Sequence, residues 1–402
     1  MRLVSDVRLF LTVGGAGKLI SIMLLYGIGT GILAPMNAIY LHDLLGLTKG
    51  EVATVYSVSL LLNMITTISV GIVSDRMRHK KKLPLLAALI CLAGLSLYMR
   101  ADGFVGALIG MSIATAPSGL IMGQLFAMAR NHFALKAPSI LEMSLVWLRA
   151  GFSVGFFIGL LLGANLYLLF GFQGVFIGNL SGYIGLIVIL LLYKEVSPTH
   201  SEVPRGKAEP FSLVMLLALL MLTCADSIRG LYLPLVVNHL FGKPQLMSYL
   251  WSAQAVFELL FMTITSYWAV KYGSKQIIVL GSVFAVLAYI LYATAAPLPL
   301  FYAVQPFYSF YVSILYGVAM GVVQRMFVHR TGFGSSLYVF LTQGASLIGY
   351  LLPVLLKGIS SAIFIIPIIL VLCAILIITR LIAREKAVNS KVNNAKLTEG
   401  KS

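Results

Sequence analysis

Three side chains in one apolar stretch share a helix face and could bind a sugar. Trp251, Gln254 and Glu258 stand at positions i, i+3 and i+7, which fall on the same side of an α-helix. A tryptophan ring can pack against the C–H face of a sugar, while an amide and a carboxylate can hydrogen bond to its hydroxyls. The same stripe would suit a flat cationic drug. The carboxyl group could also carry a proton, because removal from water favours the uncharged form of a carboxylic acid.

Three further ionisable residues lie inside apolar stretches: Arg149, Asp226 and Arg229. An ionisable group at bilayer depth costs at least about 2.5 to 3.5 kcal/mol on insertion scales, so each needs a partner, a water-filled cavity or a function. Arg149 could hold a hydroxyl-rich ligand or pair with Glu258, and a purely structural Glu258 is the alternative to a proton carrier. Asp226 and Arg229 stand at i and i+3, which predicts that they pair with each other. The alternative is that Asp226 carries protons and Arg229 binds substrate.

Other polar residues could line the same path. They are Asn63, Gln124, Tyr232, Gln324 and Gln343. Each could instead form a hydrogen bond between neighbouring helices, a common use of polar side chains inside membranes. The candidate substrate-binding residues are therefore Arg149, Trp251, Gln254, Glu258, Arg229, Tyr232, Asn63 and Gln343.

These residues belong to a chain with the composition of a membrane protein. Of its 402 residues 59% are hydrophobic and only 10% are charged, with a mean hydropathy of +0.97, which excludes a water-soluble globule. A spanning helix needs about 20 apolar residues. Unbroken apolar runs exclude the alternating strands of a barrel, and the first run is too long for a cleaved signal peptide. The sequence predicts an all-α membrane protein with twelve spanning helices, near residues 19–42, 51–74, 83–100, 103–129, 139–168, 172–193, 211–239, 247–270, 276–295, 300–324, 332–357 and 360–380.

The net charge of +16 follows from the expected topology. Most of the 29 Lys and Arg residues fall in alternate loops and in the two tails, which places both termini in the cytoplasm. The opposite loops hold only Lys49, Arg100, Lys243 and Lys357. Because the positive charge is spread over many loops, it does not indicate a nucleic-acid partner. The basic tail from residue 385 could rest on anionic membrane lipid.

The sequence contains no motif for ATP, metal or covalent chemistry. No phosphate-binding loop ends in Lys-Ser or Lys-Thr, and no His-Glu-x-x-His or serine elbow is present. Cys91, Cys224 and Cys373 lie within apolar runs and are expected to pack as small apolar residues. Glycines at four-residue spacing from Gly151 predict a close helix contact. We expect a monomer that is not an enzyme, has no cofactor and no metal, and acts on a small molecule.

Two internal repeats predict a duplicated bundle. The run Gln124-Leu-Phe-Ala-Met-Ala-Arg130 is echoed by Gln324-Arg-Met-Phe-Val-His-Arg330, and the loop beginning at Gly71 is echoed from residue 266. Inverted or parallel repeats are the usual architecture of secondary transporters. The predicted organisation is a first six-helix bundle at 1–193, a proline-rich cytoplasmic linker at 194–210, a second bundle at 211–384 and a tail at 385–402.

The loop after the second predicted helix carries a family signature. Its spacing is Gly-x-x-x-Asp-Arg-x-x-x-Lys, formed by Gly71, Asp75, Arg76 and Lys80. With two six-helix halves, this loop resembles the major facilitator superfamily over essentially the whole chain, although Arg78 stands where that family has a second glycine. The resemblance implies two pseudo-symmetric bundles that rock about a site at mid-membrane. It also implies a gating role for this loop and for the equivalent loop residues Gln124, Arg130, Gln324 and Arg330.

Finer features resemble the sugar efflux transporter family within that superfamily. The run from Gln124 to Arg130 is the most specific, and Ala34-Pro35, Arg149-Ala150 and Glu258 support it. The resemblance implies export of small sugars or glycosides across the cell membrane, which we expect to be driven by proton antiport. A proton-coupled multidrug exporter of the same fold is the alternative, although the proline typical of that class is missing after Gly155. A membrane sensor that transports nothing is a further alternative.

Overall fold

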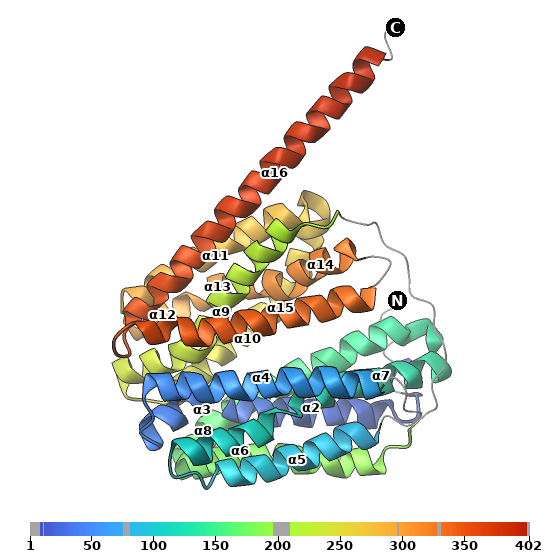
Figure 1. Cartoon of the computed structure of the whole chain (residues 1–402). Helices are drawn as coiled ribbons and strands as arrows, with labels where there is room; N and C mark the ends of the chain where they lie inside the picture. Colours follow the sequence, from blue (N-terminus) through green and yellow to red (C-terminus); the bar gives the residue numbers. More distant parts are fainter. Residues whose placement is uncertain are drawn as a thin grey trace. The chain divides into compact units, whose positions relative to one another are not determined.

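The computed structural model describes residues 9–10, 12–74, 81–195, 210–295, 297–327 and 331–399, and within these ranges every regular element is a helix (Figure 1). Contacts between Cα atoms divide the chain into two compact units. Unit 1 comprises Met1–Pro204 and Leu233–Ser252, and unit 2 comprises Arg205–Tyr232 and Ala253–Ser402.

Unit 1 contains a series of apolar helices, two of which are interrupted at prolines. Pro35 stands between α2 and α3, and Pro117 stands between α6 and α7, because proline lacks the N–H that would continue a helix. The elements are α2 (Ala16–Leu33), α3 (Asn37–Ile39), the π-helical turn η1 (Tyr40–Leu44), α4 (Lys49–Ser74), α5 (Lys82–Tyr98), α6 (Phe104–Thr115), α7 (Ser118–Lys136) and α8 (Leu141–Leu192).

The long element α8 is a helical hairpin. Its 52 residues would extend about 78 Å as a straight helix, far more than the about 30 Å of a hydrocarbon core. Its helical dihedrals break at Gly171, where φ is 60° and ψ is −153°. A Cβ added at Gly178 would lie 2.5 Å from the Leu166 side chain, so the two limbs pack against each other. The predicted break between residues 168 and 172 therefore falls at Gly171.

Glycines bring α2 and the first limb of α8 into backbone contact. A Cβ added at Gly155, Gly159 or Gly163 would lie 2.2 to 2.5 Å from a carbonyl oxygen of α2. From the other side, a Cβ at Gly27 would lie 2.2 Å from the carbonyl oxygen of Phe152. Small residues at four-residue spacing permit this approach between membrane helices. The contact that the Gly-x-x-x-Gly repeat predicts is present.

Two lysines stabilise the end of α8. Lys81 donates hydrogen bonds to the carbonyl oxygens of Leu191 and Tyr193, at 2.9 and 2.6 Å, and Lys18 donates to that of Leu192 at 2.8 Å. The last carbonyls of a helix have no intrahelical partner, and a cation is favoured there by the helix dipole. These two basic residues thus provide hydrogen-bond donors for the last carbonyl groups of α8.

Unit 2 contains most of the remaining helices. Its first two helices extend beyond the unit: the part of α9 from Leu233 onward and the part of α10 up to Ser252 belong to unit 1, and Pro234 lies just past the first boundary. The elements are α9 (Leu213–Phe241), α10 (Gln245–Tyr272), α11 (Ser274–Ala293), α12 (Leu298–Ala303), α13 (Gln305–Ser313), the π-helical turn η3 (Ile314–Ala319), α14 (Met320–Met326), α15 (Thr331–Leu351) and α16 (Ile365–Glu399).

The helices have the length and composition of membrane spans. Within the described ranges nine are long and apolar enough to cross a membrane, or ten if α10, bent by 41° beside Thr263, counts as one. The apolar helix Lys82–Tyr98 is slightly shorter. Large aliphatic side chains such as Leu169 and Val270 are exposed, by 72% and 89%, as expected for surfaces that face lipid. The helical, apolar character predicted for the fold is confirmed.

We predict that Gly155→Ala destabilises the protein and that Gly123→Ala does not. The added methyl at position 155 would meet a backbone carbonyl of α2, whereas nothing lies within 4 Å of a Cβ at position 123. Overpacking costs about 1–3 kcal/mol, while alanine in place of an exposed helical glycine gains up to about 1 kcal/mol. Thermal unfolding in detergent, followed with a thiol-reactive dye that reports exposure of buried Cys91 and Cys224, measures both. Equal unfolding temperatures would contradict the close contact.

Candidate functional site

Asp226 is the centre of a polar cluster in unit 2. It lies midway along α9, and its two carboxylate oxygens accept hydrogen bonds from Tyr308 of α13 and from Tyr316 of η3, the latter at 2.6 Å. Two turns of α-helix take about 7.2 residues, whereas these tyrosines are eight residues apart. The wider π-helical turn η3 absorbs the additional residue. Both hydroxyls can therefore reach one carboxylate.

Arg229 lies one turn further along α9 and is held by aromatic and amide groups. Its side chain is 3% exposed, and its guanidinium carbon is 3.8 Å from the centre of the Tyr308 ring and 5.8 Å from that of Tyr292. Nη2 donates to Oε1 of Gln305 at 3.2 Å. The Gln305 amide donates in turn to the Phe301 carbonyl at 2.6 Å, which fixes its orientation. A desolvated cation–π contact contributes about 2 kcal/mol or more.

Asp226 and Arg229, predicted from their spacing to pair with each other, are connected through a third side chain. Both side chains are described, and no ion pair joins them in this part of the chain. Tyr308 links them instead, since its hydroxyl donates to Asp226 while its ring face contacts Arg229. Asp226 and Arg229 are still close enough to interact electrostatically.

The predicted stripe of Trp251, Gln254 and Glu258 lies on α10, next to α13. Ser309 donates to the backbone carbonyl of Gln254 at 2.9 Å, and Ser313 donates to that of Glu258 at 3.1 Å. Trp251 Nε1 and Gln254 Oε1 are buried and have no hydrogen-bond partner among the described residues. This helix face therefore carries one unfilled donor and one unfilled acceptor.

Glu258 and Asp226 approach the same tyrosine. Glu258 is half-buried and close enough to Tyr316 to interact electrostatically, while Tyr316 donates its hydroxyl to Asp226. Tyr316 itself is 36% exposed. Two carboxyl groups from α9 and α10 thus meet at one accessible side chain of η3.

Two of the predicted binding residues form hydrogen bonds between helices. Asn63 of α4 donates to the carbonyls of Thr115 and Ala116 at 2.7 and 3.2 Å, at the break between α6 and α7. Tyr232 is fully buried and donates to the carbonyl of Tyr350 at 2.6 Å. Both side chains stabilise helix contacts, and their contact with substrate stays a prediction.

The remaining predicted residues are spread over both units. In unit 1 Arg149 is exposed on the first limb of α8, and in unit 2 Gln343 is half-buried in α15. Of the gating residues, Gly71 lies in the last turn of α4, Gln124 is buried and Arg130 half-buried in α7, and Gln324 is half-buried in α14. The others lie outside the described residues: Asp75, Arg76, Lys80 and Arg330.

Sequence reasoning missed the contribution of α13 and η3. Tyr308 and Tyr316 bind the acid, and Gln305 binds the arginine. One signal was present, because Gln305, Ser309 and Ser313 repeat at four-residue spacing within an apolar run. That spacing marks a polar helix face.

We predict that Tyr308→Phe lowers stability more than Tyr311→Phe. Both tyrosines are fully buried, but Tyr308 donates to a charged carboxylate and Tyr311 to the uncharged carbonyl of Leu222. Hydrogen bonds to charged groups contribute about 1.5–3 kcal/mol and neutral ones about 0.5–1.5 kcal/mol. Tyr308→Leu should cost about 2 kcal/mol more than Tyr308→Phe, because it also removes the ring under Arg229. Unfolding free energies in detergent measure all three, and equal losses for the two phenylalanine variants would rule out the charge-assisted bond.

Comparison with known proteins identifies the family. The model of the Major Facilitator Superfamily matches residues 19–350 and again residues 215–400. Sugar efflux transporter A of Escherichia coli is 22% identical over 325 residues, covering 78% of this chain and 81% of the relative. A putative sugar efflux transporter of Deinococcus radiodurans is 23% identical over 369 residues, covering 88% and 93%. Sugar efflux transporter A of Dickeya chrysanthemi is 26% identical over 359 residues, covering 85% and 88%.

Solved structures share the fold at lower identity. A mutant of the nucleoside transporter NupG matches with a TM-score of 0.76 at 15% identity, over 91% of this chain and 98% of the other. A POT family transporter in complex with a thioalcohol conjugated peptide matches with a TM-score of 0.74 at 15% identity, over 92% and 96%. The resemblance seen in the sequence is confirmed: this chain belongs to the major facilitator superfamily and is a multi-pass membrane transporter of small molecules, not an enzyme.

Proposed function

We propose that this transporter exports small sugars or glycosides across the cell membrane in exchange for protons. The observation that carries the proposal is the α10 face, where the unfilled Trp251 donor and Gln254 acceptor lie on the same stripe as Glu258. A ligand with hydroxyl groups satisfies a donor and an acceptor at once, because each hydroxyl can play either part. The sugar efflux transporters among the relatives of this chain support the same substrate class.

The proposal includes twelve crossings with both termini in the cytoplasm. The hairpin α8 supplies two crossings, the bent α10 supplies one and the short α5 supplies one. The positive loops orient the chain. The two six-helix bundles occupy residues 1–193 and 211–384, with a cytoplasmic linker at 194–210 and a tail at 385–402. The loop that contains Gly71, Asp75, Arg76 and Lys80 gates the cytoplasmic side.

The α10 face favours a sugar over a lipophilic cation. A cation would gain from the Glu258 carboxylate and from an aromatic ring, but a hydrocarbon cation such as tetraphenylphosphonium has no acceptor for the indole N–H of Trp251. A buried donor left without a partner costs about 1–3 kcal/mol. Arg149 would offer donors for hydroxyl groups, and Arg229, Asn63, Tyr232 and Gln343 are the further residues that we propose for substrate binding.

The two acids give a route for coupling to protons. Ionised Asp226 accepts from Tyr308 and Tyr316 and so joins α9 to α13 and η3. A protonated carboxylic acid has a hydrogen of its own to donate, so protonation would weaken one of these bonds. Glu258, beside Tyr316, would take up and release the exchanged proton. Such a change biases the two conformations of a transporter only if the proton binds one of them more tightly.

Counterflow into proteoliposomes tests the substrate class. Liposomes preloaded with unlabelled glucose, galactose or maltose should accumulate the labelled sugar transiently when they contain this protein, and liposomes without protein should not. Counterflow of labelled tetraphenylphosphonium instead of the sugars would favour the multidrug exporter. Absence of flux for every solute, in a preparation shown to be folded by its cooperative unfolding, would favour a membrane sensor.

We predict that Glu258→Gln abolishes export driven by a pH gradient but retains counterflow. Glutamine keeps the shape of the side chain and can still form hydrogen bonds, but its amide does not take up a proton at physiological pH. Counterflow requires no net proton movement, so it also reports that the variant is folded. Asp102→Asn, at an acid in the loop between α5 and α6, serves as the matched control and should retain both activities. Unchanged gradient-driven export in Glu258→Gln would remove its coupling role.

A further inference from the structure

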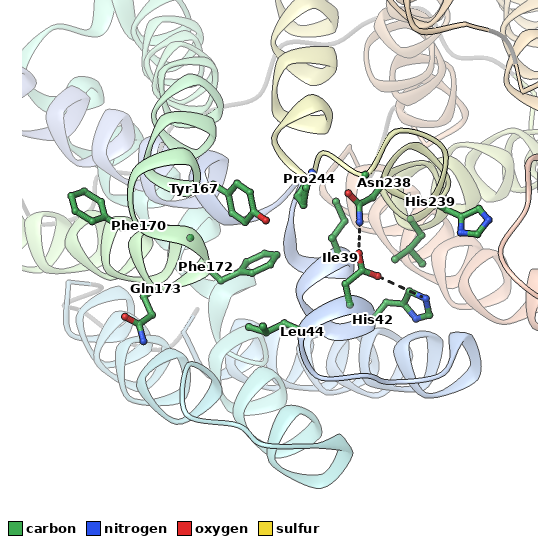
Figure 2. Close-up of a pocket in the computed structure, with 14 residues that line it drawn as sticks. Ile39, His42, Leu44, Tyr167, Phe170, Phe172, Gln173, Asn238, His239 and Pro244 are labelled. Atoms are coloured by element: carbon green, nitrogen blue, oxygen red, sulfur yellow. Dashed lines mark hydrogen bonds and ion pairs between the residues drawn. The ribbon is translucent and has the colours of Figure 1, made fainter.

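A cavity lies in unit 1, at the turn of the α8 hairpin (Figure 2). Its volume is about 800 Å³, and its lining comes from η1, from α8 on both sides of Gly171 and from the end of α9 with the following turn. All of these segments belong to unit 1. We call this space the elbow cavity. Cavities of about 300–1,000 Å³ are typical of small-molecule sites.

Two aromatic rings form a fixed wall of the elbow cavity. The positive φ of 60° at Gly171 lets the chain reverse, so that Tyr167 of the first limb and Phe172 of the second meet with ring centres 5.0 Å apart at 71°. Phe172 is held in turn by the ring of Tyr40 at 5.4 Å. Figure 2 shows Tyr167 and Phe172 on the α8 side of the cavity, facing Asn238. Rings of this kind offer an apolar face with little loss of side-chain freedom.

Polar groups opposite these rings present unfilled hydrogen-bond acceptors. One oxygen of Asp43 accepts from the Asn238 amide, and the other lies 3.9 Å from Nε2 of His42 (Figure 2). Nδ1 of His42 is 2.7 Å from the carbonyl oxygen of Leu47, which can only accept, so Nδ1 carries the hydrogen and the neutral ring presents Nε2 as an acceptor. Asn238 Oδ1 is also buried, with no partner among the described residues.

We propose that the elbow cavity is a second binding site for a neutral polyhydroxylated ligand. A ligand hydroxyl can donate to His42 Nε2 and a neighbouring hydroxyl to the Asp43 oxygen, because these two acceptors lie 3.9 Å apart and do not bond to each other. A third hydroxyl can donate to Asn238 Oδ1, and the apolar face of a sugar ring fits the Tyr167 wall. Tetraphenylphosphonium, a cation without hydrogen-bond donors, would satisfy neither His42 nor Asn238. That the ligand is the exported sugar rests on the proposed function above, whereas its chemical class rests on the cavity alone.

Protection of an introduced cysteine tests this site without measuring transport. Leu44 is 60% exposed and lines the cavity, so Leu44→Cys places a thiol at its edge. Cys373 is the half-buried native cysteine and is replaced by serine, while Cys91 and Cys224 are buried. In detergent-solubilised full-length protein, we expect glucose, galactose or maltose to slow maleimide labelling of this thiol with a saturable dependence on sugar concentration.

Matched variants assign the protection to the elbow cavity. Tyr167→Ala removes the ring wall and Asp43→Asn removes the charged acceptor, and each should raise the half-protecting concentration about tenfold, the weight of one charge-assisted or aromatic contact. Tyr167→Phe keeps the ring and should protect like the parent. Leu168→Ala, an exposed neighbour that does not line the cavity, controls for general damage to α8.

The outcomes separate this site from the proposed function. Sugar counterflow without sugar protection, or protection that Tyr167→Ala and Asp43→Asn leave unchanged, would overturn the elbow site and leave sugar export standing. Protection that responds to these variants in a protein without sugar counterflow would support the site and overturn sugar export. Protection by tetraphenylphosphonium but by none of the sugars would overturn the proposed ligand chemistry.

Discussion

An ionised side chain inside a bilayer must be stabilised by neighbouring protein groups, and in unit 2 this requirement determines how α9, α13 and η3 meet. Asp226 needs hydrogen-bond donors, and Arg229 needs either an acceptor or the face of an aromatic ring. Tyr308 meets part of both needs, with its hydroxyl on the acid and its ring on the guanidinium. A shift of α13 along α9 would expose two charges at once. The cluster therefore fixes the position of α13 along α9, two helices whose other contacts are mostly apolar.

Irregular backbone occurs in this protein where side chains replace the lost hydrogen bonds or use the altered geometry. Asn63 bonds the carbonyls that precede Pro117, as the shortage of water in a membrane requires. The π-helical turns η3 and η1 carry Tyr316 and Asp43, which bind Asp226 and Asn238 of α9. Such turns are frequent at functional sites because they re-aim one side chain without breaking the helix. Both candidate ligand sites lie beside one of them.

The sequence predicted the helical, apolar character of the chain but not the partners of its polar side chains. Apolar runs bounded by loops predicted the long helical stretches, including the break that falls at Gly171, because the length of a span is fixed by the membrane. The stripe of Trp251, Gln254 and Glu258 followed from helical spacing, because residues three, four or seven positions apart lie on one face of a helix. The partners of Asp226 and Arg229 did not, since local spacing suggests only neighbours on one helix, whereas Tyr308 and Gln305 are more than 70 residues away. Partners on another helix depend on how helices pack and rotate, which periodicity does not encode.

The proposed division of roles between the two acids rests on their surroundings. Asp226 lies beside Arg229 and accepts from two tyrosine hydroxyls, so its charge is balanced within unit 2. Glu258 lies instead on the α10 face that carries the unfilled groups of Trp251 and Gln254, where the proposed ligand would bind. A proton on Glu258 therefore changes the charge that the ligand meets, whereas a proton on Asp226 mainly changes the contact between helices. In the proposed cycle protonation of Glu258 changes ligand binding, and protonation of Asp226 changes the packing of the helices. Tyr316 lies near both acids and is the side chain through which the protonation of one acid can influence the other.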